Sequence, residues 1–288
     1  MHAVTVPTPA FRTRDGSLAI HQVPAWQDNL IWIAVCTRSG DAAVIDGPDA
    51  GPVVDYCAQH SLRIRAILNT HTHADHVGIN RALVSHVPDL RVVGPKRRAE
   101  EVPGLTEPVD EADVVRIGEV EGRVMLTEGH MDGHVSYVFA DVVFCGDTMF
   151  GAGCGYLFDG PPSKMHASLE RLAALDPSTR VCCAHEYTQD NLRFAYSVEP
   201  GNAALRQRIR RDLSVRARGE STIPSTIGEE RATNPFLRHR SEELRANVAR
   251  AMPDRSLDDS LAVFAATRAL KDRKDYKSIT DEELLRGS

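Results

Sequence analysis

The chain has 288 residues, of which 42% are hydrophobic and 26% are charged, and its formal net charge is −6. This length and apolar content suffice for one large domain or two unequal ones, and the negative balance disfavours a nucleic-acid partner. We expect no membrane-spanning helix, no secretory signal and no disulfide framework, because there is no long apolar run and the six cysteines form no CxxC pair.

Strand-like and helix-like runs alternate along the first 186 residues. Apolar β-rich runs predict strands, helical periodicity and starting prolines predict helices, and the turn residues at 38–41 predict a hairpin. The expected strands are 29–37, 42–47, 64–70, 90–95, four successive runs between 114 and 147, and 180–186. The expected helices are 52–60, 79–87 and one that Ser163 would cap. This alternation predicts an α/β fold of layered sheets covered by helices.

The pattern changes after residue 187, where helical periodicity dominates. Helices are expected at 189–198, 202–219, 241–252 and 256–276. Glu199-Pro200-Gly201 and the stretch 219–228 interrupt them. We therefore predict two domains, 1–186 and 187–288, with a smaller α-helical second domain.

The most informative motif is Thr70-His71-Thr72-His73-Ala74-Asp75-His76, directly after an apolar strand. It places three histidines and an aspartate within six residues. Imidazole and carboxylate are ligands that zinc, iron and manganese accept. A histidine-rich polar turn without a metal is the less favoured interpretation, because histidine makes up only 12 of the 288 residues.

Three further candidate ligands also follow strand-like runs: His130, Asp147 and His185. A single buried histidine or aspartate is more often a hydrogen-bonded core or capping residue. Taken with the first loop, however, they complete a set of five histidines and two aspartates. Such a set is large enough for two metal ions.

The order of these motifs resembles that of the glyoxalase II (hydroxyacylglutathione hydrolase) family. The resemblance is carried by HTHADHVG, GHMDGH, FCGDTMFGAGCG and CAHEYTQDNLRFA, and later by VEPGNAAL, IPSTIGEE and NPFLR. It runs from about residue 22 to 276. It implies a metallo-β-lactamase αββα sandwich over 1–186, the catalytic domain, followed by a substrate-binding helical domain over 187–288.

The resemblance also assigns the metal ligands. It implies that His71, His73 and His130 bind a first ion, that Asp75, His76 and His185 bind a second, and that Asp147 bridges the two. Asp75 and Asp147 are thereby the candidate catalytic carboxylates. The family uses zinc, with iron or manganese as alternatives, so two divalent ions are expected per chain. His134 matches a family histidine outside the metal set, and a structural hydrogen bond is its expected role.

Five residues match substrate-contacting positions of the family. Tyr187 corresponds to a tyrosine that touches glutathione, and Lys271 and Lys274 to basic residues that grip the carboxylate end of the tripeptide. Phe158 stands where the family has Tyr or Phe. Tyr156, however, stands where the family usually has a basic residue, a departure that bears on the preference for glutathione.

The activity that the resemblance implies is hydrolysis of S-(2-hydroxyacyl)glutathione, such as S-lactoylglutathione, by attack of a metal-bridging hydroxide. This reaction belongs to methylglyoxal detoxification. One alternative is a mononuclear iron persulfide dioxygenase using His71, His130 and Asp147; others are a hydrolase of another thioester, a nuclease and a non-enzymatic metal-binding module. We expect a cytoplasmic monomer or weak homo-oligomer that acts on a small molecule, away from nucleic acid and membranes.

Overall fold

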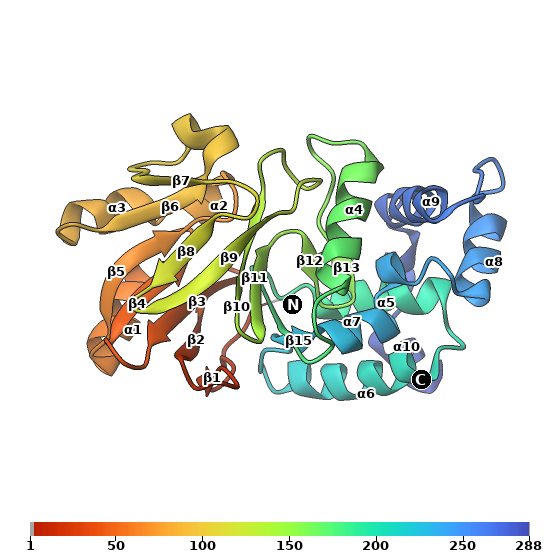
Figure 1. Cartoon of the computed structure of the whole chain (residues 1–288). Coiled ribbons are helices and arrows are strands. Elements are labelled where there is room, and N and C mark those ends of the chain that lie inside the picture. Colours follow the sequence, from red (N-terminus) through yellow and green to blue (C-terminus); the bar gives the residue numbers. More distant parts are fainter. Residues whose placement is uncertain (1–2, 288) are drawn as a thin grey trace.

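The computed structural model describes residues 3–287, in which two β-sheets pack face to face between helices (Figure 1). The first sheet follows the chain order: β1 (Phe11–Arg12), β2 (Leu18–Ala25), β3 (Asn29–Cys36), β4 (Asp41–Ile45), β5 (Arg63–Leu68), β6 (Arg91–Pro95) and β7 (Glu107–Val109). The second has the order β15 (Ser225–Thr226), β14 (Arg180–Cys183), β11 (Val142–Gly146), β10 (Val135–Phe139), β9 (Val120–Leu126) and β8 (Val114–Ile117). A short hairpin pairs β12 (Met149–Phe150) with β13 (Gly153–Cys154).

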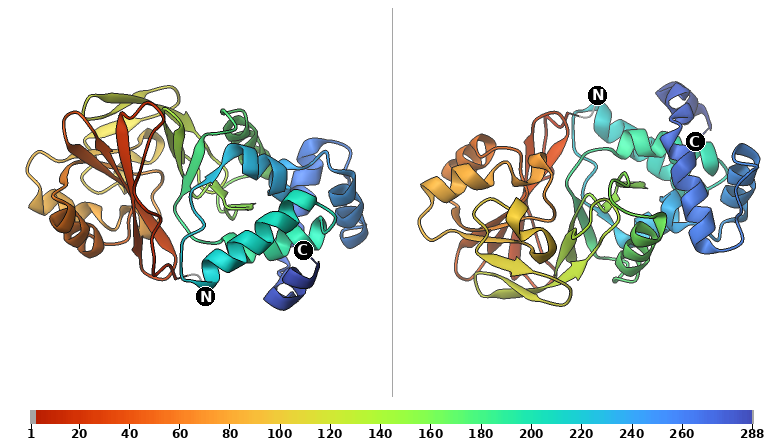
Figure 2. Two further views of the ribbon diagram at one scale, coloured as in Figure 1. Left: turned by 90° about the horizontal axis from the view of Figure 1, so that it is seen from below. Right: turned by 90° about the horizontal axis from the view of Figure 1, so that it is seen from above.

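Helices cover the outer face of each sheet. Those on the first sheet are α1 (Gly51–His60), α2 (Ala74–Val77), α3 (Asn80–His86) and the 3₁₀ turn η1 (Lys96–Glu101). The remaining helices are α4 (Pro162–Ala173), α5 (Thr188–Val198), α6 (Ala203–Ala217), α7 (Ile227–Thr233), η2 (Pro235–Leu237), α8 (Glu242–Ala251), α9 (Ser260–Asp272), η3 (Asp275–Ser278) and α10 (Asp281–Gly287). Figure 2 shows these later helices gathered on one side of the sandwich.

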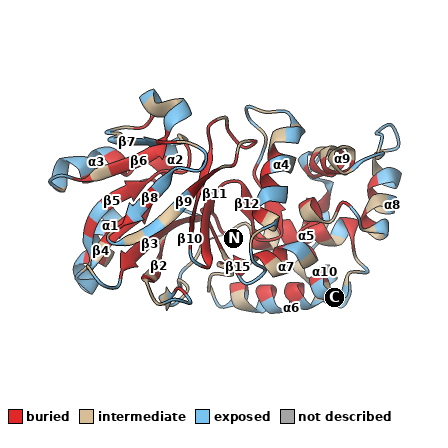
Figure 3. Ribbon diagram, in the orientation of Figure 1, coloured by how far each residue is buried: buried red, intermediate tan, exposed pale blue. Residues whose placement is uncertain are grey.

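Strand β3 shows why the sheets stack in this way. Successive side chains of a strand point to opposite faces, and every residue of β3 is buried. Its even-numbered apolar residues join the core between the sheets, and its odd-numbered ones join the core beneath α1 and α3: Leu30, Trp32, Ala34 and Cys36 against Ile31, Ile33 and Val35. The strand is therefore apolar on both faces, as a strand in the middle of a layered fold requires, and Figure 3 shows these central strands as buried.

The C-terminal helices share the core of the sandwich. Phe236 and Phe264 belong to the same buried cluster as the strands of the second sheet. Strand β15, far along the chain, pairs antiparallel with β14 at the edge of that sheet. The N-terminal arm also reaches across, because the amides of Thr5 and Val6 each donate to the carbonyl of Gly219 at 3.0 Å, just beyond α6 (Figure 2).

The αββα layers followed by helices confirm the predicted fold class. The strands expected from 29 to 186 are present, and their ends lie within three residues of the predicted ones. The N-cap assigned to Ser163 is wrong: the N-cap residue is Pro161, and α4 begins at Pro162, two residues earlier than expected. Among the described residues, no helix combines the length and apolar character that a bilayer crossing needs.

A buried charge network holds α6 and α7 together. Arg208 is only 2% exposed, and its Nη2 lies 2.8 Å from Glu230 Oε1. Arg208 Nη1 donates to Thr233 Oγ1 at 2.7 Å. The other oxygen of Glu230 accepts the amide of Ala152 at 2.9 Å, which ties these helices to the β12–β13 hairpin.

We predict that Arg208→Ala lowers the free energy of unfolding by about 3–5 kcal/mol, because it leaves the Glu230 carboxylate buried and unpaired. Urea unfolding followed by circular dichroism measures the loss. Arg211→Ala is the matched control: Arg211 lies on the same helix but its side chain is 52% exposed, so its removal should cost at most about 1 kcal/mol. Equal losses for the two variants would contradict the role given to the buried network.

Candidate metal centre

Loops from both sheets meet at one edge of the sandwich. The loop 70–76 follows β5, and residues His130, Asp147 and His185 follow β9, β11 and β14. A hydrogen bond joins the two sheets at this edge. The amide of Val135, at the start of β10, donates to the carbonyl of Thr70, which follows β5, at 2.8 Å. Residues distant in the sequence are thereby brought into one cluster.

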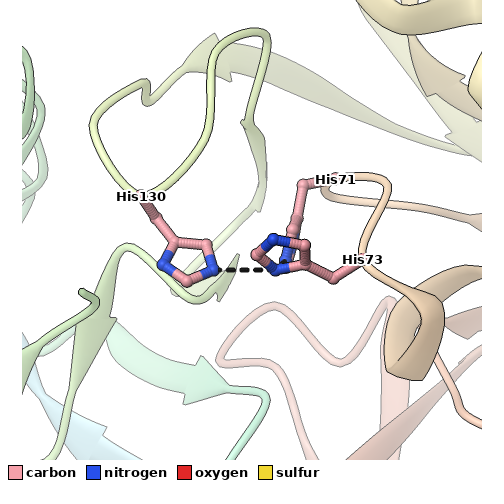
Figure 4. A group of neighbouring side chains, drawn as sticks. All are labelled: His71, His73 and His130. Atoms are coloured by element: carbon pink, nitrogen blue, oxygen red, sulfur yellow. Dashed lines mark hydrogen bonds between the residues drawn. The ribbon is translucent and has the colours of Figure 1, made fainter. Parts of the chain in front are cut away.

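Three histidines form the first part of this cluster (Figure 4). The Nδ1 atom of His73 lies 3.0 Å from His71 Nε2 and 3.0 Å from His130 Nε2. Figure 4 shows the His130 ring facing the rings of His71 and His73, with a dashed line joining His130 to His73. Each residue therefore offers one ring nitrogen to a common point.

Asp75, His76 and His185 form the second part. Asp75 Oδ2 lies 3.5 Å from His76 Nε2 and 3.3 Å from His185 Nε2. Asp147 stands between the two parts. Its Oδ1 is 3.5 Å from His76 Nε2 and 3.4 Å from His185 Nε2, whereas its Oδ2 is 3.4 Å from His130 Nε2.

These spacings fit metal coordination. A tetrahedral ion with bonds of about 2.0–2.1 Å holds neighbouring ligand atoms roughly 3.3 Å apart, close to the separations seen here. His76 Nε2 and Asp147 Oδ1 are buried and have no hydrogen-bond partner, an arrangement that is costly unless another group satisfies them. The donor set and its orphaned atoms therefore fit a metal site.

The groups that orient these candidate ligands were not predicted from the sequence. Asp28 Oδ1 lies 2.8 Å from His185 Nδ1, and Asp46 Oδ2 lies 3.0 Å from His76 Nδ1. Asn29 Nδ2 donates to Asp75 Oδ2 at 3.0 Å. Partners of this kind fix the tautomer of a metal-binding histidine so that its other nitrogen faces the ion. Single polar residues outside any motif gave no signal in the sequence.

Two residues fix the position of Asp147. His134 is fully buried, and its Nε2 accepts the backbone N–H of Asp147 at 3.2 Å, which is a structural role. Gly146 has a φ of +47°, and a Cβ there would lie 2.3 Å from Thr70 Oγ1. Only glycine allows β11 to turn this closely past the histidine loop.

The charges in the cluster shift one another's pKa values. Burial opposes ionisation of Asp147, but His185 and His76 outweigh it and hold the pKa of this carboxyl well below its usual value. Burial likewise disfavours the charged form of His185, but Asp147 and Asp28 raise its pKa well above the usual value. Burial lowers the pKa of His71. The pKa of Asp75 is lowered as well, so both aspartates are ionised and available as ligands at neutral pH.

A cleft of about 460 Å³ opens over the cluster. Its lining combines ligand residues with aromatic side chains: His73, Ala74, Asp75, His130, Asp147, Phe150, Tyr156, Phe158, His185 and Tyr187. Tyr156 and Phe158 are 53% and 59% exposed, and the Tyr187 ring stacks on His185 with centroids 4.8 Å apart. The structure therefore places three of the five expected substrate contacts beside the ligands.

The two lysines are placed differently. Lys271 lies in the interior, where it donates to Asn191 Oδ1 and its ammonium sits 5.7 Å from the centres of the Phe194 and Phe236 rings. Burial lowers its pKa to about 7. Lys274 is exposed just after α9. Neither belongs to the residues that line the cleft, so their contact with substrate stays a prediction.

The chain matches two family models. The metallo-β-lactamase superfamily model covers residues 39–185, and the model of the hydroxyacylglutathione hydrolase C-terminus covers residues 186–274. Curated hydroxyacylglutathione hydrolases are similar along nearly their whole length. Those of Alkalilimnicola ehrlichii and Gloeobacter violaceus are 46% and 42% identical, over 87% and 89% of this chain and 97% and 100% of their own.

Solved structures share the fold. ETHE1 from Myxococcus xanthus superposes with a TM-score of 0.59 at 22% identity, over 90% of this chain and 95% of its own. TTHA1623, whose crystal structure is of a di-iron-bound form, gives a TM-score of 0.51 at 25% identity, over 73% of this chain and 96% of its own. The metallo-β-lactamase fold that the motifs predicted is thereby confirmed.

We predict that Asp28→Ala weakens metal binding about 10- to 100-fold, because it removes the acceptor that orients His185. Competition against a chromophoric chelator measures the affinity. Asp49→Ala is the control, because the Asp49 carboxylate accepts from Trp26 Nε1 at 3.1 Å and from the amide of Gly51 at 2.9 Å and is not part of the cluster. This variant should leave the metal affinity unchanged. An Asp28→Ala protein that binds metal as tightly as the wild type would show that His185 needs no such support.

Proposed function

The chain belongs to the hydroxyacylglutathione hydrolase family within the metallo-β-lactamase superfamily, and we propose that it hydrolyses S-(2-hydroxyacyl)glutathione to glutathione and a 2-hydroxy acid. S-lactoylglutathione is the representative substrate. The observation that carries the proposal is the complete cluster of five histidines and two aspartates beneath a cleft, in a chain that matches both family models. The enzyme is thus a metal-dependent thioesterase.

We propose that the cluster holds two divalent ions. His71, His73 and His130 are the residues for one, and Asp75, His76 and His185 are the residues for the other. The two oxygens of Asp147 face different groups of histidines, as a bridging carboxylate requires. Zinc is the proposed metal, with iron and manganese as alternatives, because all three accept this donor set.

Bound divalent ions supply Lewis acidity and lower the pKa of water, which is the chemistry that thioester hydrolysis needs. The chain itself contributes the geometry. Asp75 and Asp147 stay ionised, and the aromatic rings of Phe150, Phe158 and Tyr187 form apolar walls that limit solvent around the acyl group. Because a thiolate leaves readily, the reaction requires no general acid and no serine or cysteine nucleophile.

A mononuclear iron dioxygenase is the less supported alternative. It would use His71, His130 and Asp147 and give no task to Asp75, His76 and His185. Yet the ligand atoms of the second group also lie together, with Asp75 Oδ2 3.3 Å from His185 Nε2, and its two histidines have their own carboxylate partners. The presence of this second group of ligands favours the hydrolase. So does the match of the C-terminal helices to the hydroxyacylglutathione hydrolase model.

The remaining proposals concern organisation and location. We propose 1–186 as the catalytic domain and 187–288 as the substrate-binding domain. All six cysteines are buried and unpaired, which supports the reducing environment of the cytoplasm. A monomer or weak homo-oligomer remains our expectation for the assembled state.

The metal proposal predicts close to two ions per chain in fully active enzyme, determined by elemental analysis. Asp147→Ala should lower kcat for S-lactoylglutathione by orders of magnitude, because it removes the carboxylate that both groups of ligands share. Asp132→Ala is the control, since Asp132 follows His130 by two residues but contacts Lys164 instead of the cluster. One ion per chain at full activity would rule out the dinuclear proposal.

The cleft predicts an effect of charge at position 156. Among the described residues, those lining the cleft include no lysine or arginine, whereas glutathione carries two carboxylates. A charge-assisted hydrogen bond is worth about 1.5–3 kcal/mol against about 1 kcal/mol for a neutral one. Tyr156→Arg should therefore lower KM for S-lactoylglutathione roughly two- to thirtyfold, with kcat little changed.

Steady-state kinetics on S-lactoylglutathione and on a thioester without glutathione measure this effect. Tyr156→Gln is the control, because it has a similar length but no charge and should not lower KM. A gain restricted to the glutathione substrate is expected. If Tyr156→Arg gains nothing on glutathione and loses activity on the other thioester, tyrosine serves a different natural substrate.

A further inference from the structure

A second group of metal-ligand side chains lies outside the cleft, at the junction of α4 with the C-terminal helices. It consists of His166, Glu170 and His239, and one ligand atom of each lies within 4.8 Å of the others. We propose that these three side chains form a zinc site that ties α4 to the C-terminal helices. This site is separate from the catalytic cluster and does not depend on the proposed reaction.

The fold brings the three residues together from two distant segments. His166 and Glu170 are four residues apart on α4, so they lie on the same face of that helix. His239 follows η2, in the connection to α8. Helix α4 packs against both η2 and α9. Figure 1 shows α4 beside α9. An ion held here would therefore link the part of the chain before residue 187 to the part after it.

Two ring nitrogens in this group lack a partner. His166 Nε2 and His239 Nδ1 are both buried from solvent, and neither makes a hydrogen bond. Leaving a buried polar atom unsatisfied costs about 1–3 kcal/mol. The His166 ring packs against Phe264, with centroids 5.6 Å apart, which holds it in this place. A bound ion would satisfy both nitrogens at once.

The donors suit zinc in type and spacing. Two imidazoles and a carboxylate are a known zinc ligand set, with the fourth position left to water. His239 Nδ1 lies 3.7 Å from Glu170 Oε1, near the roughly 3.3 Å expected between ligands of one tetrahedral zinc. Glu170 and His239 also line a surface hollow, which gives an ion a route to the site.

Neighbouring cations limit the affinity. Arg231 and Arg240 line the same hollow and are exposed, and the nearby Arg245 is engaged with backbone carbonyl groups, including that of Leu257 at 2.7 Å. Glu170 is the one carboxylate among the three ligands. We therefore expect this site to bind zinc more weakly than the catalytic cluster and to lose it first to a chelator.

Zinc stoichiometry tests the proposal on the full chain. The wild type and the variants His166→Ala, Glu170→Gln and His239→Ala are dialysed to equilibrium at one buffered zinc concentration and analysed for bound metal. Each variant should hold one zinc fewer per chain than the wild type. His86→Ala, at an exposed histidine on α3 outside any cluster, should match the wild type. Saturating zinc should also raise the Tm of the wild type more than that of Glu170→Gln.

Equal zinc content in all of these proteins would overturn the proposal and leave the three residues as an ordinary polar contact. Glu170→Gln keeps the test decisive if a histidine variant folds poorly, because the Glu170 side chain is 46% exposed and its replacement leaves the core intact. A loss of zinc from the catalytic cluster alone is distinguishable, since it would abolish hydrolysis, which the loss of the α4 site leaves in place.

Discussion

The structure depends on one shared carboxylate. Asp147 turns its two oxygens toward different groups of histidines, so the loops after β5, β9, β11 and β14 must all reach the same point. Its own position is fixed by the His134 ring that accepts its amide and by the tight turn at Gly146. These loops come from both sheets. The apolar core between the sheets therefore fixes the positions of the candidate ligands relative to one another. Fold stability and the metal site are therefore coupled.

Much of this arrangement was predictable because short stretches of the sequence determine it. The histidine loop is contiguous, and the other candidate ligands each follow an apolar strand, so all seven could be predicted from the sequence, and the structure brings them into one cluster. The ligand partners Asp28 and Asp46 were not predictable, since each is a single acidic residue that acquires its role only when distant strands pair. The short helix α7 was missed because it lies in a segment with the breakers Pro224 and Gly228.

Lys271 illustrates a further limit of sequence reasoning. The family resemblance predicts that it contacts the carboxylate end of glutathione, and the structure places its side chain against Asn191 and near the Phe194 ring. Helical periodicity gives the face on which a residue lies but not what covers that face. The lining of the cleft was also hard to predict from the sequence, because its aromatic and acidic side chains come from four separate loops.

The cleft over the cluster is proposed to bind glutathione thioesters. The most direct test compares kcat/KM for S-lactoylglutathione with that for a lactoyl thioester of a small thiol that lacks the tripeptide, using the metal-loaded full chain. We expect hydrolysis of both substrates and a clear preference for S-lactoylglutathione, and we expect the chelator-treated enzyme to lose all activity. Equal kcat/KM values, or a preference for the small thiol, would contradict this proposal.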